Sequence, residues 1–203
     1  MTNPEPDDMP ALLAAAARGE EPAWRELVNR YGRRVFALAK SRCGDVHVAE
    51  EITQSVFATV AAKLGGGEYT ELGKFEPWLF RVAMNRLRDH VRRARRRPVS
   101  SDDGAIEATA APVASAAADE AALEGLRDAM EQLAPADREI VELRHHGGLS
   151  FKQIAELLDE PMGTLLARHH RALKKLREIL EGKQDGKVGG KQAESHRVRA
   201  AGA

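Results

Sequence analysis

The sequence predicts an all-α protein with two small helical domains joined by a flexible linker. Apolar side chains recur at three- and four-residue steps through most of the 203 residues, and no stretch alternates as a strand does. Residues 98–122 interrupt this pattern, because they are small and acidic and bury too little apolar surface to fold alone. We therefore expect a loose segment at 1–9, a first domain at 10–97, the linker at 98–122, a second domain at 123–181 and a disordered basic tail at 182–203.

The first domain is predicted to contain one short helix and three longer ones. The segment "PALLAAAARGE" predicts the short helix, closed by Gly19, and apolar stripes predict helices at about 21–42 and 49–64. A fourth helix begins near Glu76, with Pro77 suited to its first turn. Before it, "GGGEYTELGKF" predicts a loop, since three successive glycines make a helix costly. The stripe of the second helix consists of Trp24, Leu27, Val28, Tyr31, Val35, Leu38 and Ala39.

The formal net charge is zero, but the charges are segregated along the chain. Residues 81–97 carry eight arginines against one aspartate, and residues 98–124 carry six acids with no lysine or arginine. Residues 164–177 then carry five basic residues and no acid. Two basic blocks around an acidic spacer favour two separate contacts with nucleic acid. The linker extends about 3.4 Å per residue, which is enough to reach two such contacts.

The second domain is predicted to hold four helices, of which the last two form a helix-turn-helix. Ser150 is a good N-cap, "DEPMGT" supplies the turn, and the following helix would enter the major groove of duplex DNA. Leu166 is expected either to touch a thymine methyl group or to cap the core, and His169 falls inside the apolar stripe. The predicted DNA contacts on this helix are Thr164, Leu166, Ala167, Arg168, His170, Arg171 and Lys174.

The helix from Glu76 is predicted to carry a second DNA-binding face. A flat aromatic, an amide and a row of arginines suit a surface that holds unstacked bases and their phosphates. The alternative for Trp78 is that it packs under the glycine-rich loop, and both interpretations can hold together. The predicted contacts on this helix are Trp78, Arg81, Asn85, Arg88, Asp89 and Arg92.

The helix before that loop shows a different surface, which is small and nearly uncharged. Glu51, Gln54, Ser55 and Ala58 lie away from its buried stripe, and small side chains permit close approach by another helix. We therefore predict a protein-docking face here in preference to a merely solvated one.

Several classes of function are disfavoured. The histidine pairs at 145–146 and 169–170 cannot share an ion, because adjacent helical residues point about 100° apart. We expect no metal, cofactor, small-molecule substrate or catalytic residue, which argues against a metal-dependent nuclease. Neither a signal peptide nor a membrane-length apolar run is evident, and Cys43 is the single cysteine, so a cytoplasmic location is expected. A stand-alone helix-turn-helix regulator remains the alternative.

Two long segments resemble the sigma factors of bacterial RNA polymerase, in particular the short extracytoplasmic-function group. "WRELVNRYGRRVFALAKSRCGDVHVAEEITQSVFATV" with "FEPWLFRVAMNRLRDHVRRARRR" resembles region 2 of that family. "LAPADREIVELRHHGGLSFKQIAELLDEPMGTLLARHHRALKKLREIL" resembles its region 4, so that the likeness covers about 130 of the 203 residues.

The resemblance implies a set of partners and roles. Core RNA polymerase would dock through its beta-prime clamp on the helix with Glu50, Glu51 and Gln54, and its beta flap is a further implied contact. The glycine-rich loop and the helix bearing Asn85 would hold a base flipped from the minus-ten promoter element, and the second helix of region 4 would read the minus-thirty-five element. Nucleoid association with polymerase is implied, as is room for control by an anti-sigma factor.

The chain departs from the family's pattern in region 4. Members usually carry a hydrophilic pair where this chain has Leu166 and Ala167, and leucine where it has His169. Preference for the upstream promoter element is therefore not predicted. The promoter sequence, the regulon, the inducing signal and any control by phosphorylation or by the tail are likewise not predicted.

Overall fold

The computed structural model describes the backbone of residues 9–96 and 114–200, and the side chains of residues 9–94 and 122–182. Eight helices and no strand occur within these ranges, which confirms the all-α prediction. They are α1 (Met9–Ala17), α2 (Glu21–Cys43), α3 (Val46–Gly65), α4 (Phe75–Arg96), α5 (Ala114–Glu131), α6 (Pro135–His145), α7 (Phe151–Leu158) and α8 (Met162–Ala200).

The chain divides into two compact units. The described part of the first unit contains α1 to α4 together with residues 142–165, and that of the second contains residues 114–141 with α8 from Leu166 onward. The division therefore passes within α6 and α8. Residues 142–165, although distant in sequence, pack with the N-terminal helices.

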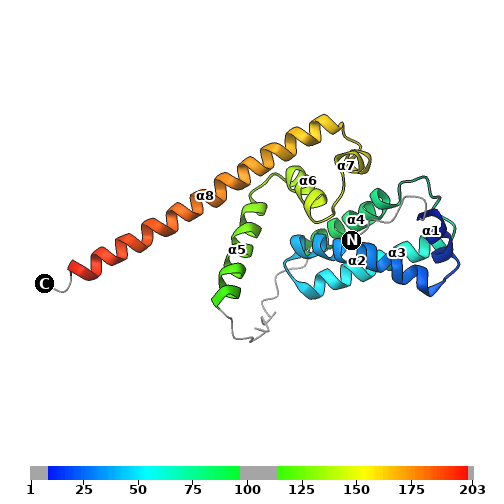
Figure 1. The fold of residues 1–203 in the computed structure, drawn as a ribbon, viewed down its shortest axis with the longest axis horizontal. Helices are drawn as coiled ribbons and strands as arrows, with labels where there is room; N and C mark the ends of the chain where they lie inside the picture. Colours follow the sequence, from blue (N-terminus) through cyan, green and yellow to red (C-terminus); the bar gives the residue numbers. More distant parts are fainter. Residues whose placement is uncertain (1–8, 97–113, 201–203) are drawn as a thin grey trace. The chain divides into compact units, whose positions relative to one another are not determined.

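The core of the first unit is formed by the apolar stripes of α2, α3 and α4, which lie side by side with α1 at one end (Figure 1). The stripes recur every three or four residues because an α-helix turns once in 3.6 residues. Val28 was expected in the stripe of α2 but is 44% exposed, since it points about 100° away from the fully buried Leu27. The fully buried large side chains from these helices include Leu27, Leu38, Leu79, Phe80, Met84 and Leu87.

The junction between α2 and α3 is a two-residue reversal with a cap on each side. Gly44 is in the left-handed conformation, with φ of 74°, and its N–H donates to the Lys40 carbonyl at 3.0 Å. The Asp45 carboxylate then accepts from the Val48 N–H at 3.0 Å as the N-cap of α3, and this bond lowers the pKa of Asp45. The two caps place α3 beside α2.

Residues 142–165 complete the first unit with the end of α6, all of α7 and the first turn of α8. Gly148 has a φ of 65°, which lets the chain turn sharply between α6 and α7. Ser150 and Gln153 form a reciprocal capping box at the start of α7, as the N-cap prediction for Ser150 expects. Asp159 ends α7 with a φ of 56°. The apolar side chains buried here are Leu143, Leu149, Ile154, Leu157 and Leu165.

The second unit has a smaller core. Its buried apolar side chains come from the end of α5, the loop after it, the first part of α6 and α8. Lys175 of α8 donates to the Gln132 carbonyl at 2.8 Å, which ties α8 to the end of α5. The core consists of Ala129, Met130, Leu133, Val141, Ala172 and Leu176, with Ile179 and Leu180 packed against it.

Two predicted boundaries differ from the helices. Residues 97–113 of the predicted linker and residues 1–8 of the predicted loose segment lie outside the described residues, but α5 begins at Ala114, within the linker. The backbone of α8 is helical as far as Ala200, whereas the sequence predicts a disordered tail at residues 182–203. An α-helix satisfies its backbone hydrogen bonds internally, so it can continue without an apolar face. The sequence prediction relied on such an apolar face.

We expect Ser150→Ala to lower the free energy of unfolding by about 1 kcal/mol, because the capping hydroxyl is lost while the rest of α7 is kept. Urea denaturation followed by circular dichroism measures the change. Ser150→Thr retains the hydroxyl and serves as the control. Equal stability of the alanine variant and the parent would contradict the role given to this cap.

Candidate nucleic-acid interface

The predicted face on α4 is partly at the surface. Asn85, Arg88 and Arg92 are exposed, and their spacing of three and four residues places them along one side of the helix. Arg88 Nη1 donates to Asn85 Oδ1 at 3.3 Å, so a guanidinium lies beside the amide. This arrangement offers amide hydrogen-bonding groups for a base edge and positive charge for phosphates.

Trp78 packs against the glycine-rich loop. Its ring centroid lies 4.3 Å from that of Tyr69 and 5.8 Å from that of Phe75, and the side chain is half-buried. The alternative interpretation of Trp78 as a packing residue is therefore correct in this structure, although half-burial leaves part of the residue in contact with solvent. Stacking ties the loop to the first turn of α4.

The loop between α3 and α4 is tied internally by Glu71. The Tyr69 hydroxyl donates to Glu71 Oε2 at 2.7 Å, and the Lys74 N–H donates to Glu71 Oε1 at 3.0 Å. Burial, followed by the nearby Glu71 carboxylate, raises the pKa of Tyr69, which keeps the hydroxyl protonated as a donor. Leu72 of the same loop is 75% exposed. The sequence analysis predicted no role for Tyr69 or Leu72. The only indication in the sequence was that an aromatic residue and a leucine occur within a polar loop.

Arg81 is exposed but is engaged by α7. Its Nη2 donates to the carbonyls of Glu156 at 2.9 Å and Leu157 at 3.1 Å. These are among the last carbonyls of α7, which lack partners within the helix, and a cation is stabilised there by the helix dipole. Arg81 therefore differs from Asn85, Arg88 and Arg92, because its guanidinium is bonded to α7.

The predicted docking face lies on α3. Glu50, Glu51, Gln54 and Ala58 are exposed, and Ser55 is half-buried. A shallow pocket continues this face onto α4, where the half-buried Asp89 is found. The pocket is lined by Glu51, Ile52, Ser55, Arg86, Asp89, His90 and Arg93.

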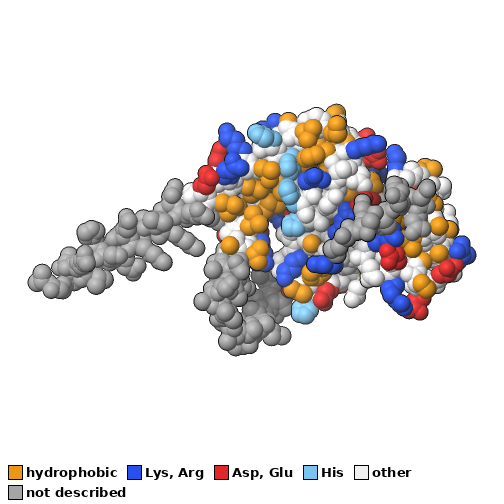
Figure 2. Space-filling view, in the orientation of Figure 1, with side chains coloured by type: hydrophobic (Ala, Val, Ile, Leu, Met, Phe, Trp, Pro, Cys, Tyr) orange, Lys and Arg blue, Asp and Glu red, His pale blue; other side chains and the backbone are white. Residues whose placement is uncertain are grey.

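Most of the predicted DNA contacts on α8 are exposed. Leu166 is 44% exposed, which disfavours the alternative that it caps the core. His169, as predicted for the stripe, is half-buried, and so is Arg168. Figure 2 shows Lys and Arg side chains beside hydrophobic ones over the start of α8, so this face is both basic and apolar. The exposed predicted contacts are Thr164, Leu166, Ala167, His170, Arg171 and Lys174.

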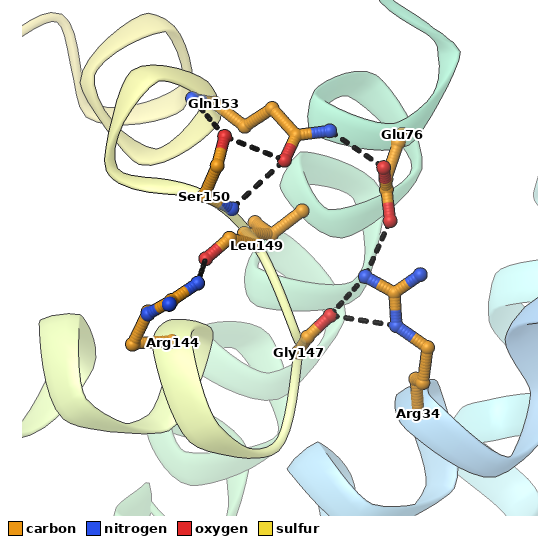
Figure 3. A network of polar contacts seen from close by, with 7 residues as sticks. All are labelled: Arg34, Glu76, Arg144, Gly147, Leu149, Ser150 and Gln153. Carbon is orange, nitrogen blue, oxygen red and sulfur yellow. Dashed lines mark hydrogen bonds and ion pairs between the residues drawn. The ribbon is translucent and has the colours of Figure 1, made fainter. Parts of the chain in front are cut away.

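A polar network joins α2 and α4 to the segment around α7 (Figure 3). Arg34 of α2 donates through Nε to the Gly147 carbonyl at 2.7 Å and also forms an ion pair with Glu76 of α4. Gln153 Nε2 donates to the other Glu76 oxygen at 2.5 Å. Glu76 therefore bridges α2 and α7. No local signal in the sequence predicts these contacts, because even the nearest partners, Arg34 and Glu76, lie far apart in sequence and Arg34 and Gly147 lie 113 positions apart.

A buried ion pair lies near this network. Arg42 at the end of α2 donates through Nε to Glu142 Oε2 of α6 at 2.6 Å. The Glu142 side chain is fully buried and that of Arg42 is 15% exposed. Removing Arg42 would deprive the buried Glu142 carboxylate of this ion pair, which is costly at a buried position.

Within the described residues, no group of three or more histidine, cysteine, aspartate or glutamate side chains is placed to hold a metal ion. None of the helices searched in the same ranges is long and apolar enough to cross a membrane.

Comparison with known proteins identifies both halves of the chain. The family model described as Sigma-70 region 2 matches residues 27–97, and the one described as Sigma-70, region 4 matches residues 123–176. The chain is 34% identical to the RNA polymerase sigma factor CarQ of Myxococcus xanthus over 80% of this chain and 91% of CarQ. It is 32% identical to the ECF RNA polymerase sigma factor SigE of Mycolicibacterium smegmatis over 87% of this chain and 70% of SigE.

Solved structures show the same fold. The chain of CnrH, solved in complex with the cytosolic domain of CnrY, aligns over 88% of this chain and 99% of its own, with a TM-score of 0.67 and 24% identity. The sigma factor RpoE of Bartonella quintana, solved with the anti-sigma factor NepR, aligns over 77% of this chain and 96% of its own, with a TM-score of 0.56 and 18% identity.

Because His146 is half-buried, we expect the free energy of unfolding to depend on pH. Burial lowers the pKa of His146, so the unfolded chain binds its proton more readily than the folded one. The free energy of unfolding should therefore fall as the pH drops through about 6.5, the usual histidine pKa. Urea denaturation at a series of pH values measures this slope.

The neighbouring His145 is exposed and provides a matched control. His146→Asn should reduce the loss of stability between neutral and mildly acidic pH, whereas His145→Asn should leave it close to that of the parent. The same pH slope in both variants would contradict the assignment to His146.

Proposed function

Because this chain belongs to the extracytoplasmic-function group of the sigma-70 family of bacterial RNA polymerase sigma factors, we propose that it binds core RNA polymerase and recognises promoters through separate faces on α3, α4 and α8. The observation that carries the site assignment is that most of the predicted residues are exposed on their helices. Sigma factors are not enzymes, and this one acts by placing polymerase at a start site in the cytoplasm, associated with the nucleoid.

The downstream promoter element binds α4 and the loop before it. Asn85 contacts a base, while Arg88 and Arg92 contact phosphates and Trp78 stiffens the loop. Extruding a base from the stack costs a few kcal/mol, and an ordered loop with a positioned amide offsets part of that cost. Asp89 lies at the edge of this face, and Arg81 joins it when its contacts with α7 are released.

The upstream element binds as duplex to α8. Thr164, Ala167 and Arg171 lie near the start of the helix, which is the part that reaches base edges in helix-turn-helix proteins. Lys174 and His170 lie on the same exposed side and contact the DNA backbone. The exposed Leu166 replaces a polar contact by an apolar one, which suits a thymine methyl group.

Core polymerase binds the face on α3. Glu50, Glu51, Gln54, Ser55 and Ala58 meet the beta-prime clamp, and region 4 meets the beta flap. The small side chains at the centre of this face support close packing by a partner helix. An anti-sigma factor is a further proposed partner, supported by the RpoE chain of similar fold, which was solved with one.

The function is tested by purified full-length chain and core polymerase in a genome-wide run-off transcription assay. The proposal predicts a discrete set of start sites that core polymerase alone does not use. An unchanged set of start sites would contradict it.

We expect Arg171→Ala to weaken promoter binding by about 1–3 kcal/mol, because a side chain on the exposed contact face is lost. Run-off transcription from a promoter recovered by the assay measures the effect. Arg177→Ala removes the same charge outside the proposed contacts and is the control. Equal losses in the two variants would contradict the placement of Arg171.

We expect Asn85→Ala to impair opening of the promoter more than the initial binding of duplex, because the amide is assigned to an unstacked base. Permanganate footprinting of the melted region, compared with filter binding of the closed complex, separates the two steps. A pre-melted template should therefore raise transcription by the variant more than it raises transcription by the parent. An equal effect on both would show that this role for Asn85 is wrong.

A further inference from the structure

The glycine-rich loop between α3 and α4 contains a carboxylate that uses both of its oxygens. Glu71 Oε2 accepts from the Tyr69 hydroxyl at 2.7 Å, and Glu71 Oε1 accepts from the Lys74 N–H at 3.0 Å. The second bond closes a short turn that includes Leu72 and Gly73. We call these two hydrogen bonds the Glu71 clasp.

The clasp is anchored to α4 through aromatic rings. The Tyr69 ring centroid lies 4.3 Å from that of Trp78 and 5.8 Å from that of Phe75, whose side chain is buried. Asn85, which is assigned to an unstacked base, lies about two turns after Trp78 on the same helix. The turn closed by Glu71 is therefore attached to the helix that carries the proposed downstream DNA face.

The composition of the loop makes it costly to order. It includes Gly66, Gly67 and Gly73, and glycine loses more conformational freedom on ordering than any other residue. Gly73 has a φ of 72° and directly precedes Lys74, whose N–H is bonded to Glu71. A loop that is already ordered loses less entropy when it binds a ligand, so it binds that ligand more tightly.

The charge of Glu71 argues against direct contact with DNA. A carboxylate repels phosphate, so its removal from a surface that binds DNA would ordinarily tighten binding. Here the side chain is half-buried, and both of its oxygens are bonded within the loop. Glu71 is therefore suited to act on DNA through the residues that it holds, among which Leu72 is 75% exposed.

We propose that Glu71 is a positioning residue for the downstream promoter element, because its clasp orders the glycine-rich loop before DNA binds. This inference rests on the proposed function, since the same element is proposed to bind this loop and α4. The ligand that depends on the clasp is a single strand of promoter DNA with unstacked bases. Tyr69 takes part as the donor that joins the clasp to the rings of α4.

The variants that test this role separate the hydrogen bonds from the charge. Glu71→Ala removes both acceptors, whereas Glu71→Gln removes the charge but retains one oxygen acceptor. Tyr69→Phe removes one donor and keeps both the charge and the ring that stacks on Trp78. The control is Glu68→Ala, which removes an equal charge from the same loop but breaks an ion pair with Lys63 of α3 instead.

Hydrogen exchange of the Lys74 backbone amide in the full-length chain reports the clasp without DNA. We expect about fivefold faster exchange in Glu71→Ala than in Glu68→Ala, because only the former removes the acceptor of this amide. Unchanged exchange relative to the control would overturn the clasp.

Binding of a single strand to the holoenzyme reports the positioning role. The probe is the labelled non-template strand of a promoter recovered by the run-off assay, across the region that permanganate marks as melted, and fluorescence anisotropy measures its affinity. We expect about tenfold weaker binding for Glu71→Ala and about threefold weaker binding for Tyr69→Phe. Glu71→Gln should recover part of the loss, while Glu68→Ala should bind at least as tightly as the parent because it removes a like charge.

The affinity of each variant for core polymerase without DNA separates positioning from a general loss of structure. Losses of polymerase affinity equal to the losses of strand affinity would overturn the positioning role. Strand binding by Glu71→Ala as tight as that of the parent, or equal effects of alanine and glutamine at this position, would overturn it as well. If the parent holoenzyme does not bind the strand, the proposed downstream face fails and the positioning role fails with it, but the exchange comparison still decides whether Glu71 orders the loop.

Discussion

The structure depends on one packing constraint, which is that α2, α3 and α4 must each bury one apolar stripe against the others. Fully burying a leucine or phenylalanine contributes about 1.5–3 kcal/mol, so these stripes outweigh any preference of the polar sides. Once the stripes meet, the rotation of each helix about its axis is set. The outward sides are then decided as well: small residues on α3 around Gln54 and Ala58, and an amide with arginines on α4 around Asn85. The proposed partners bind what the core leaves outside.

The second feature of the structure is long-range and polar. Arg34 and Glu76 reach the segment around α7, and the buried pair of Arg42 and Glu142 lies nearby. Apolar packing stabilises the helices and sets the rotation of each about its axis. The polar contacts select one arrangement of α7 on the region 2 helices. Because charged groups recover their hydration on separation, the two kinds of contact differ in how easily they are exchanged for a partner. The proposed function, in which the chain binds polymerase and DNA at once, calls for both a rigid core and exchangeable contacts.

Local patterns in the sequence predicted the helices and most of the candidate faces. Periodicity finds the stripe of α4 and hence the opposite side with Asn85 and Arg88, and the capping signal of Ser150 predicts the start of α7. The assignment to sigma factors, predicted from the resemblance, is confirmed by the family models, and the relatives named above favour it over a stand-alone regulator. The contact of Arg34 with Gly147 could not be predicted, since no local signal links residues 113 positions apart. The position of Trp78 in the sequence is compatible both with contact to a base and with packing on the glycine-rich loop. The ring contact with Tyr69, which is visible only in the structure, shows that Trp78 packs on the loop.

The central claim is that this chain recognises promoters as a subunit of polymerase and not by itself. An electrophoretic mobility shift assay with a recovered promoter duplex tests it directly, using the chain alone, core polymerase alone and the two together at physiological salt. The account predicts a specific, competitor-resistant complex only when both are present. A specific complex of equal affinity formed by the chain alone would contradict it, and would make the protein a stand-alone helix-turn-helix regulator.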